Sequence, residues 1–411
     1  MVDLPAEFLE RMKKLPGTDF GEFLKSYQKP AVKGLRFSWK ARPDTIRKLI
    51  SDWRLEKIPW ADTGYFYPDD VRPGLSPYHD AGLFYIQEPS AMAVAEAAGI
   101  SPDDVVLDLC AAPGGKSTRA AEIAKMLVCN EIIPSRAKIL SSNIERMGIG
   151  NAIVCSAAPD RISDAFCAYF DVVIVDAPCS GEGMMRKDET AIREWSVENV
   201  NTCIQRQKEI LRYADRCVKD GGKLVYSTCT FEPEENEIQI VHFLEDHPEY
   251  TVLVQKTFYP HTDRGEGQFY AVLKKGAGEP VRSREDLPAL IRQAQKTLLS
   301  AGIHILRSGI MAGEHMTDKK KRDIYIPSHA EVMASDFEST PFENAADLSG
   351  EQQALSFLKG NQLSLCEESI RLKNDKDCFL GVYFDGYPLG LGKKTGGSLK
   401  NHLPKGLRRI S

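Results

Sequence analysis

The hydrophobic pattern of the first 95 residues changes between helical and strand spacing. Apolar residues recur at helical spacing in two short stretches, namely Phe8, Leu9, Met12 and Leu15, and then Phe20, Phe23, Leu24 and Tyr27. Strand-like runs follow at residues 34–39 and 65–67, with a predicted helix at Thr45–Ile50 between them. We therefore predict a small mixed N-terminal domain over residues 1–95.

Residues 96–275 have a different pattern, in which apolar strands alternate with helices. Strands are predicted at residues 105–109, 127–132, 152–155, 171–176, 223–228, 251–254 and 268–274. Helices are predicted from Ser117, from Pro134 to Gly148, over residues 197–218 and from Pro233. Such alternation is typical of a parallel sheet covered by helices, so we predict a doubly wound α/β domain.

The stretch from Lys274 to Pro280 has the composition of a linker. Beyond it the pattern predicts smaller α+β pieces. We divide them into an intermediate C-terminal domain at residues 281–345 and a final domain at residues 346–411.

Composition narrows the class of protein. The chain has 411 residues, of which 42% are hydrophobic and 27% charged, as expected for a globular protein with two or three domains. No apolar run approaches the roughly 20 residues that cross a bilayer, and the first residues do not form a signal peptide pattern. The ten cysteines include no C-x-x-C pair, which argues against a structural zinc site and favours reduced thiols. We expect a cytoplasmic protein with no bound metal and no membrane partner.

Charge is distributed unevenly along the chain. The net charge is −5, but residues 393–411 contain six Lys or Arg and no Asp or Glu. Phosphate binding depends on such local basic patches more than on the sum. Taken alone, this segment fits a solvated basic tail as well as it fits an RNA contact.

A turn rich in small residues follows the first strand of the α/β domain. It consists of Cys110, Ala111, Ala112, Pro113, Gly114, Gly115 and Lys116, with Asp108 before it and Ser117 after it. Small residues let backbone N–H groups approach a ligand at the start of the next helix. Glu131 ends the second strand, where a doubly wound fold places a carboxylate that binds ribose hydroxyls. The two features together predict a nucleotide-like cofactor.

A phosphate-binding NTPase loop is the competing interpretation. Gly115-Lys116-Ser117 matches the end of that motif, and the strand that ends at Asp176 resembles its magnesium-binding strand. The motif needs Gly five residues before Gly115, and that position is Cys110. We therefore regard the NTPase interpretation as the minor alternative.

Two cysteines follow neighbouring strands of the predicted sheet. Cys179 lies in Asp176-Ala-Pro-Cys-Ser-Gly after the fourth strand, and Cys229 lies in Ser-Thr-Cys-Thr after the fifth. A single cysteine at a strand end is usually a packing residue, but two at adjacent ends lie over the same ligand crevice. Such thiols suit covalent catalysis, because a thiolate that adds to carbon-6 of a pyrimidine makes carbon-5 nucleophilic. Asp176 is a candidate to stabilise charge on the ring.

These motifs resemble the Nol/Nop/Sun family of RNA cytosine-5 methyltransferases, and most of all its bacterial RsmF-like ribosomal RNA branch. The matching segments are Gln87–Ser90, Cys110–Lys116, Asn130-Glu131, Asp176–Gly183, Ser227–Thr230 with Pro233–Asn236, Gly386–Gly390 and Lys400–Arg408. The resemblance spans the whole chain. It implies a class I methyltransferase sheet flanked by a ferredoxin-like N-terminal module and a PUA-like C-terminal module, both of which bind RNA.

The resemblance also implies roles for residues that spacing alone leaves open. Cys229 would be the nucleophile, Cys179 would serve product release, and Asp176 would lie between the cofactor and the base. Residues 110–116 would bind S-adenosylmethionine, and Glu131 would hold its ribose. The expected residue for the adenine after the third strand is missing, and only Ser156 or Asp160 stands nearby.

The expected substrate is structured RNA, with 16S ribosomal RNA favoured, transfer RNA as an alternative and no DNA partner. The target cytosine must leave its stack to be reached. A protein that keeps the fold but acts only as an RNA-binding or ribosome-assembly factor is the alternative function from another class.

Overall fold

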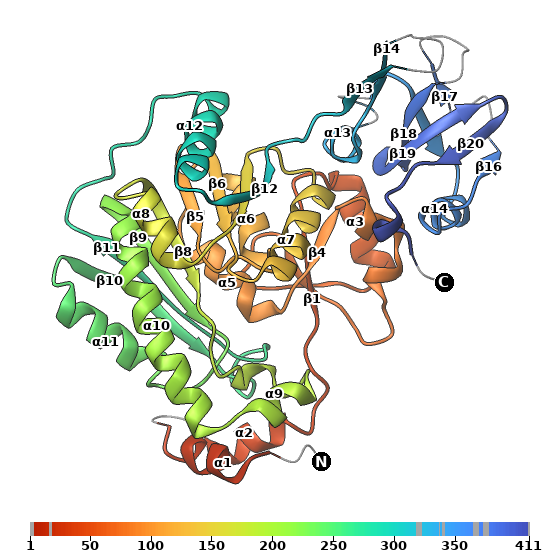
Figure 1. Ribbon diagram of the computed structural model, residues 1–411. Coiled ribbons are helices and arrows are strands. Elements are labelled where there is room, and N and C mark those ends of the chain that lie inside the picture. Colours follow the sequence, from red (N-terminus) through yellow and green to blue (C-terminus); the bar gives the residue numbers. More distant parts are fainter. Residues whose placement is uncertain are drawn as a thin grey trace.

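The computed structural model describes residues 4–15, 19–317, 323–336, 338, 342–364, 370–372 and 378–409. An eight-stranded sheet with helices on both faces forms the centre of this structure (Figure 1). Its strands are β5 (Val105–Asp108), β6 (Met126–Asn130), β7 (Ala152–Ser156), β8 (Phe170–Asp176), β9 (Val218–Thr228), β10 (Tyr250–Phe258), β11 (Gln268–Lys275) and β12 (His304–Ser308). Its helical segments are α5 (Pro89–Ala97), α6 (Gly115–Ile123), α7 (Pro134–Arg146), α8 (Pro159–Ala165), η2 (Glu182–Met184), α9 (Glu189–Glu194), α10 (Val197–Cys217), α11 (Glu237–Asp246) and α12 (Leu287–Ser300).

The strand order of this sheet is β10-β11-β9-β8-β5-β6-β7-β12. Strands β5 to β9 are parallel, whereas β11 pairs antiparallel with β9. The chain starts at β5, moves outward to β7 and then returns to β8 on the other side of β5. Because the order reverses there, a ligand crevice is expected beyond the carboxyl ends of β5 and β8. The predicted doubly wound sheet is confirmed.

Two details of this domain differ from the sequence-based expectation. The helix predicted from Pro233 begins only at Glu237, because residues 232–236 form turns that bury the side chain of Glu235. The predicted intermediate domain at residues 281–345 does not begin as a separate unit. Its helix α12 buries Leu290, Ala294 and Leu298 in the central core, and β12 adds a strand beside β7.

The N-terminal module is a four-stranded antiparallel sheet with the order β2-β3-β1-β4. Its elements are β1 (Gly34–Phe37), α3 (Pro43–Asp52), β2 (Glu56–Lys57), β3 (Gly64–Phe66), η1 (Pro73–Leu75), α4 (Pro77–Asp80) and β4 (Phe84–Ile86). This order is that of the split βαβ, ferredoxin-like arrangement. The two preceding helices, α1 (Ala6–Met12) and α2 (Phe20–Ser26), pack elsewhere, against Trp195, Val200 and Phe231 of the central domain.

The C-terminal module is built around a six-stranded sheet with the order β16-β20-β19-β18-β15-β17. Its elements are β13 (Glu314–Thr317), β14 (Asp323–Ile326), α13 (His329–Met333), β15 (Ala345–Leu348), α14 (Glu351–Leu358), β16 (Leu363–Ser364), β17 (Ile370–Arg371), β18 (Phe379–Phe384), β19 (Tyr387–Thr395), β20 (Ser398–Asn401) and η4 (Lys405–Leu407). Lys393 and Lys400 therefore lie on paired strands. Residues 393–409 therefore belong to this sheet and the turns after it rather than to an extended tail, because Leu399 and Leu403 are buried in the core.

The N-terminal and C-terminal modules share one hydrophobic core, although the whole central domain separates them in the sequence. Leu35, Phe37 and Phe84 of the first module lie in the same buried cluster as Phe357 and Leu389 of the second. We call these two joined sheets, β1–β4 and β15–β20 with helices α3, α4 and α14, the flanking platform. Figure 1 shows them side by side at one end of the central sheet.

No helix within the described residues is long and apolar enough to span a membrane.

Candidate active site

The turn after β5 is fixed by contacts at both ends. Ser117 donates a 2.6 Å hydrogen bond to Oδ2 of Asp108, which ties the start of α6 to the end of β5. Gly114 has a φ of 115°, a left-handed conformation that other residues adopt only with strain. From α7, Arg136 donates to the carbonyl oxygen of Ala112 at 2.9 Å. The small residues thus let the chain turn tightly at the crevice that the strand order predicts.

A cavity of about 280 Å³ lies against this turn. Six of the seven loop residues proposed from sequence line it, all except Gly114, and Asp176 lines it as well. Gln87, Glu88 and Asp108 also belong to its polar wall, and Met184 belongs to its apolar wall. The predicted cofactor loop therefore faces a real cavity at the reversal of strand order.

Asp108 is the residue that best indicates what this cavity binds. It is buried, and its Oδ1 atom has no hydrogen-bond partner. Burial raises the pKa of its carboxyl group to about 7, against the opposing effect of the Ser117 hydrogen bond. A cationic amino group in the cavity would give Oδ1 a partner and would favour the ionised form. The cavity thus fits a ligand with an ammonium group, such as the methionine part of S-adenosylmethionine.

Glu131 follows β6 directly, as predicted, but it does not line the cavity. Its side chain is buried, accepts a 2.9 Å hydrogen bond from the backbone N–H of Ile133, and lies 3.3 Å from the guanidinium of Arg136. A ribose that reaches Glu131 has to share it with Arg136. Ser156 ends β7 and Asp160 is exposed on α8, so neither position adds evidence for an adenine contact.

The two motif cysteines meet, as their adjacent strand ends predict. Asp176 of β8 is in register with Ser227 of β9, which brings the following loops together. The sulfur atoms of Cys179 and Cys229 are 3.4 Å apart, and the backbone N–H of Cys229 donates to the Cys179 sulfur at 3.3 Å. The hydrogen bond with Cys229 and burial raise the pKa of Cys179 well above its ordinary value. The two thiols are therefore in direct contact and share one hydrogen bond between their sulfur atoms.

Lys116 and Asp176 form an ion pair between the cavity and the thiols. The ammonium Nζ of Lys116 is 2.8 Å from Oδ2 of Asp176, and Ser227 donates to Oδ1 at 2.7 Å. Burial alone would lower the pKa of Lys116, but Asp176 and the charge of a Cys229 thiolate outweigh it and raise that pKa. Lys116 thus places a positive charge beside Asp176 and near the Cys229 sulfur.

Buried acids hold the two cysteine loops from behind. Glu182 accepts hydrogen bonds from the Thr230 hydroxyl at 2.8 Å and from the backbone N–H of Phe231 at 3.0 Å. Glu235 accepts from the backbone N–H of Ser180 at 3.0 Å. Burial raises the pKa of Glu182 to about 7 and also raises the pKa of Glu235. Each loop is therefore fixed by a carboxylate from the other, so the sulfur atoms have little freedom to separate.

Three polar residues of this site were missed as functional residues from sequence: Asp108, Glu182 and Glu235. A signal was present, because Glu182 lies within the Cys179 motif and Glu235 within the segment after Cys229. Acidic residues so close to reactive cysteines are candidates for a role in the site. Only the fold shows that both are buried and that each accepts a hydrogen bond from the loop of the other cysteine.

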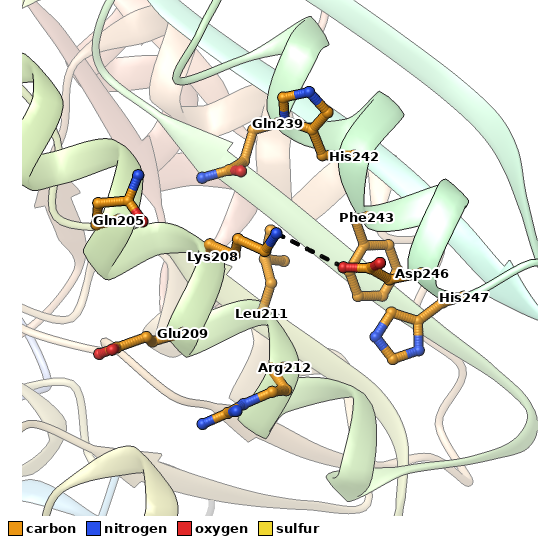
Figure 2. A pocket seen from close by; sticks show the side chains of 10 residues that line it. All are labelled: Gln205, Lys208, Glu209, Leu211, Arg212, Gln239, His242, Phe243, Asp246 and His247. Atoms are coloured by element: carbon orange, nitrogen blue, oxygen red, sulfur yellow. Dashed lines mark ion pairs between the residues drawn. The ribbon is translucent and has the colours of Figure 1, made fainter.

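A different cavity of about 410 Å³ lies between α10 and α11 (Figure 2). Lys208 and Asp246 face each other across it at 3.7 Å, above Leu211 and Phe243. None of the predicted site residues lines this cavity. It is therefore a weaker candidate for the active site than the crevice beyond β5 and β8.

Comparison with known proteins gives a consistent picture. Residues 97–274 match the family model "16S rRNA methyltransferase RsmB/F", residues 4–89 match the N-terminal domain of 16S rRNA methyltransferase RsmF, and residues 344–409 match the methyltransferase RsmF PUA domain. "Ribosomal RNA small subunit methyltransferase F" of Vibrio atlanticus is 30% identical over 99% of this chain and 98% of its own length. The protein of the same name from Pectobacterium carotovorum is 29% identical over 99% of this chain and 96% of its own length.

Solved structures support the same fold. A methyltransferase homologue from Pyrococcus horikoshii superimposes with a TM-score of 0.59 and 25% identity, over 67% of this chain and 96% of its own. NSun6 from the same organism, in a structure with SFG, gives a TM-score of 0.57 at 20% identity, over 67% of this chain and 99% of its own. At that identity the second likeness concerns the fold alone.

Proposed function

Because this chain belongs to the family of RsmF-type 16S ribosomal RNA methyltransferases, we propose that it methylates carbon-5 of a cytosine in 16S ribosomal RNA through a covalent bond to Cys229. The observation that carries the proposal is the 3.4 Å contact between the Cys179 and Cys229 sulfur atoms beside the cofactor cavity. S-adenosylmethionine, when bound, supplies the methyl group. The cytoplasm is the compartment in which such an enzyme meets its RNA.

The cofactor cavity would hold its ligand by charge and by shape. Asp108 would accept hydrogen bonds from the amino group through its unpartnered Oδ1. The small side chains of residues 110–115 allow close approach of the backbone. Glu131 would accept from ribose hydroxyls in place of, or together with, its contact to Arg136.

The nucleophile would be Cys229. The Cys179 sulfur lies 3.4 Å from that of Cys229, so its S–H could donate a hydrogen bond to the attacking sulfur. Lys116 adds a positive charge nearby. Addition of this thiolate to carbon-6 of the base makes carbon-5 electron-rich enough to take up the methyl group. Asp176, held by Lys116 and Ser227, would hydrogen-bond the base edge as charge develops on the ring.

Release would use Cys179. The hydrogen bond with Cys229 is the largest cause of its raised pKa, and this cause is removed once the Cys229 sulfur is bonded to carbon-6. Cys179 would then release its own proton to solvent, its thiolate would take the carbon-5 proton, and the electrons of that C–H bond would restore the ring double bond and expel the Cys229 sulfur as a thiolate. Attack and release are thereby divided between two thiols that lie in contact.

The proposal is tested by incubating the purified protein with S-adenosylmethionine and protein-free 16S ribosomal RNA, 30S subunits, 23S ribosomal RNA or transfer RNA. Bisulfite sequencing then locates any 5-methylcytosine. We expect methylation of 16S ribosomal RNA that is lost in Cys229→Ala. Methylation of transfer RNA alone would show that transfer RNA, and not 16S ribosomal RNA, is the substrate. RNA binding without methylation of any of these RNAs would favour the assembly-factor alternative.

A competing activity is tested in the same preparation. We expect S-adenosylmethionine binding by calorimetry and no specific ATP hydrolysis, since Cys110 stands where an NTPase loop needs Gly. Magnesium-dependent ATP turnover that disappears in Lys116→Ala would contradict this.

A further inference from the structure

The sheet of the N-terminal module has both faces covered. Side chains alternate along β1, so Leu35 and Phe37 enter the core of the flanking platform while Arg36 points to the central domain. There Arg36 forms a buried 3.0 Å ion pair with Glu122 and donates to Thr118 at 2.8 Å. A four-stranded sheet of this kind often binds RNA bases on its open face. Here the β1 side chains on both faces are buried, which leaves the edges and turns of this module as candidates for RNA contacts.

One such turn presents an exposed aromatic side chain. Trp39 follows β1 and is 60% exposed, and it is the one exposed residue among the described Trp and Phe residues. Single exposed apolar side chains are common on protein surfaces, so the position of Trp39 matters more than its exposure alone. Trp195, by contrast, is buried and donates its indole N–H to Glu182.

The residue after Trp39 anchors the turn to all three parts of the molecule. The ammonium Nζ of Lys40 is buried and donates to the carbonyl oxygen of Met333 at 2.6 Å. The carbonyl oxygens of Ala81 and Arg146 each lie 3.5 Å from the same atom. Because Met333 belongs to the C-terminal module and Arg146 to the central domain, Lys40 fixes the position of the neighbouring indole.

A cavity of about 420 Å³ lies beside the Trp39 ring. Residues 334–336 after α13, together with Tyr387 and Pro388 of β19, form its other walls. Figure 1 shows α3, α13 and β19 close together at this junction. Arg42 is next to this cavity: its guanidinium is stacked 4.3 Å from the centre of the Tyr387 ring and donates to the backbone carbonyl oxygen of Asp385. Asp336 places one acidic residue in the cavity wall, so a bound phosphate has to lie on the Arg42 side. An exposed indole, a cavity and a cation at its rim are the elements that bind an unpaired nucleotide.

We propose that the junction of the three modules binds one unpaired nucleotide of the substrate RNA, with its base stacked on Trp39 and its phosphate at Arg42. This inference rests on the proposed function, since it names how the same RNA is held away from the cysteines. Stacking is tolerant of base identity, so the site selects a single-stranded segment rather than a sequence.

The test compares RNA affinity and methyl transfer in Trp39→Ala, Trp39→Phe and the wild type. Val281→Ala is the matched control, because Val281 is also apolar and is 87% exposed. With protein-free 16S ribosomal RNA as the probe, we expect Trp39→Ala to bind about tenfold more weakly, which corresponds to about 1.4 kcal/mol. Trp39→Phe should retain most of the affinity, and Val281→Ala all of it. Calorimetric affinity for S-adenosylmethionine and the methylation rate at saturating RNA should not change.

Tryptophan fluorescence adds a direct readout. A 20-nucleotide single-stranded RNA should quench part of the emission in the wild type but not in Trp39→Phe, and a duplex of the same length should quench neither. Unchanged RNA affinity in Trp39→Ala, or equal quenching in wild type and Trp39→Phe, would overturn the inference. These results are independent of the bisulfite result, so wild-type methylation of 16S ribosomal RNA with no effect at Trp39 would refute this site alone. An absence of methylation would refute the proposed function alone.

Discussion

The crevice beyond β5, β8 and β9 and the flanking platform are both buried, yet different groups fill them. The crevice buries ionisable side chains that face one another, among them Asp108, Lys116 and Glu182. The platform core is almost entirely aliphatic and aromatic, with Phe37 and Phe357 as typical members. Burying charge is unfavourable, whereas burying apolar surface is the main driving force of folding. Stability is thus concentrated in the platform and in the sheet core, and chemistry is concentrated in the crevice.

The two regions also differ in how the chain builds them. The crevice is assembled from loops that each follow a strand, so a few residues after β5, β8 and β9 supply most of it. The platform joins segments at opposite ends of the chain: Tyr78 donates its hydroxyl to Asp385, and Arg409 binds Asp80. The comparison predicts that changes in the crevice alter catalysis with little effect on RNA affinity, and that changes in the platform do the reverse.

The largest expected effect is on the methylation rate, and it distinguishes the roles of the two thiols in the crevice. Cys229→Ala should lower methylation by at least about 10³-fold, since it removes the covalent route, and should form no RNA adduct. Cys179→Ala should still attack and accept the methyl group but release the product slowly. It should accumulate a protein–RNA conjugate that survives denaturing electrophoresis.

If the roles of the two thiols are reversed, the protein–RNA conjugate should accumulate only in Cys229→Ala. Full activity in both single variants would show that neither thiol is catalytic. RNA affinity before reaction is the control, and the comparison between the regions requires it to stay near the wild-type value in both variants.

The next effect concerns stability. Phe357→Ala should destabilise the platform by about 3–5 kcal/mol, the usual cost of deleting a buried phenyl ring. Because the core is shared, hydrogen exchange should increase in β1 and β4 as well as in the C-terminal sheet, while S-adenosylmethionine binding persists. Phe166→Ala is the matched variant in the central core, where Phe166 is equally buried. It should weaken cofactor binding instead, and loss of cofactor binding in both variants would show that the regions do not unfold separately.

Sequence predicted the crevice far better than the platform, and the reason is the range of the contacts. The turn at residues 110–116 and the meeting of Cys179 with Cys229 follow from strand ends that the hydrophobic pattern already marks. Leu35 and Phe357 lie in the same core, although more than 300 residues separate them in the sequence. No local sequence pattern predicts this packing. The packing of α12 on the central core and the pairing of the strand that holds Lys400 depend on contacts of the same kind.

Asp108 gives the third effect, inside the crevice. Asp108→Asn keeps the size of the side chain but removes the charge that would face a cationic amino group. A hydrogen bond to a charged group contributes about 1.5–3 kcal/mol, so S-adenosylmethionine affinity should fall roughly ten- to a hundredfold. Calorimetry measures this, with 16S ribosomal RNA affinity as the control. Unchanged cofactor affinity would mean that the amino group binds elsewhere.

The smallest effect tests the basic end of the platform. Deleting residues 393–411 would remove β20 and the last third of β19, with which it pairs, so it would unfold the C-terminal sheet rather than probe charge. Lys400 and Lys405 are both exposed, and the double variant Lys400→Ala with Lys405→Ala leaves the buried residues of β20 in place.

If both lysines bind phosphates, the slope of log affinity against log salt should fall by about 0.7 for each lysine replaced. At moderate salt the affinity should fall by up to about fivefold for each of them, since exposed ion pairs contribute at most about 1 kcal/mol. The exposed Lys208 beside the cavity between α10 and α11 provides the matched control, because it lies on the central domain and away from the platform. An equal reduction in Lys208→Ala would show that RNA binding is spread over both regions, and an unchanged slope in the double variant would show that these lysines are merely solvated.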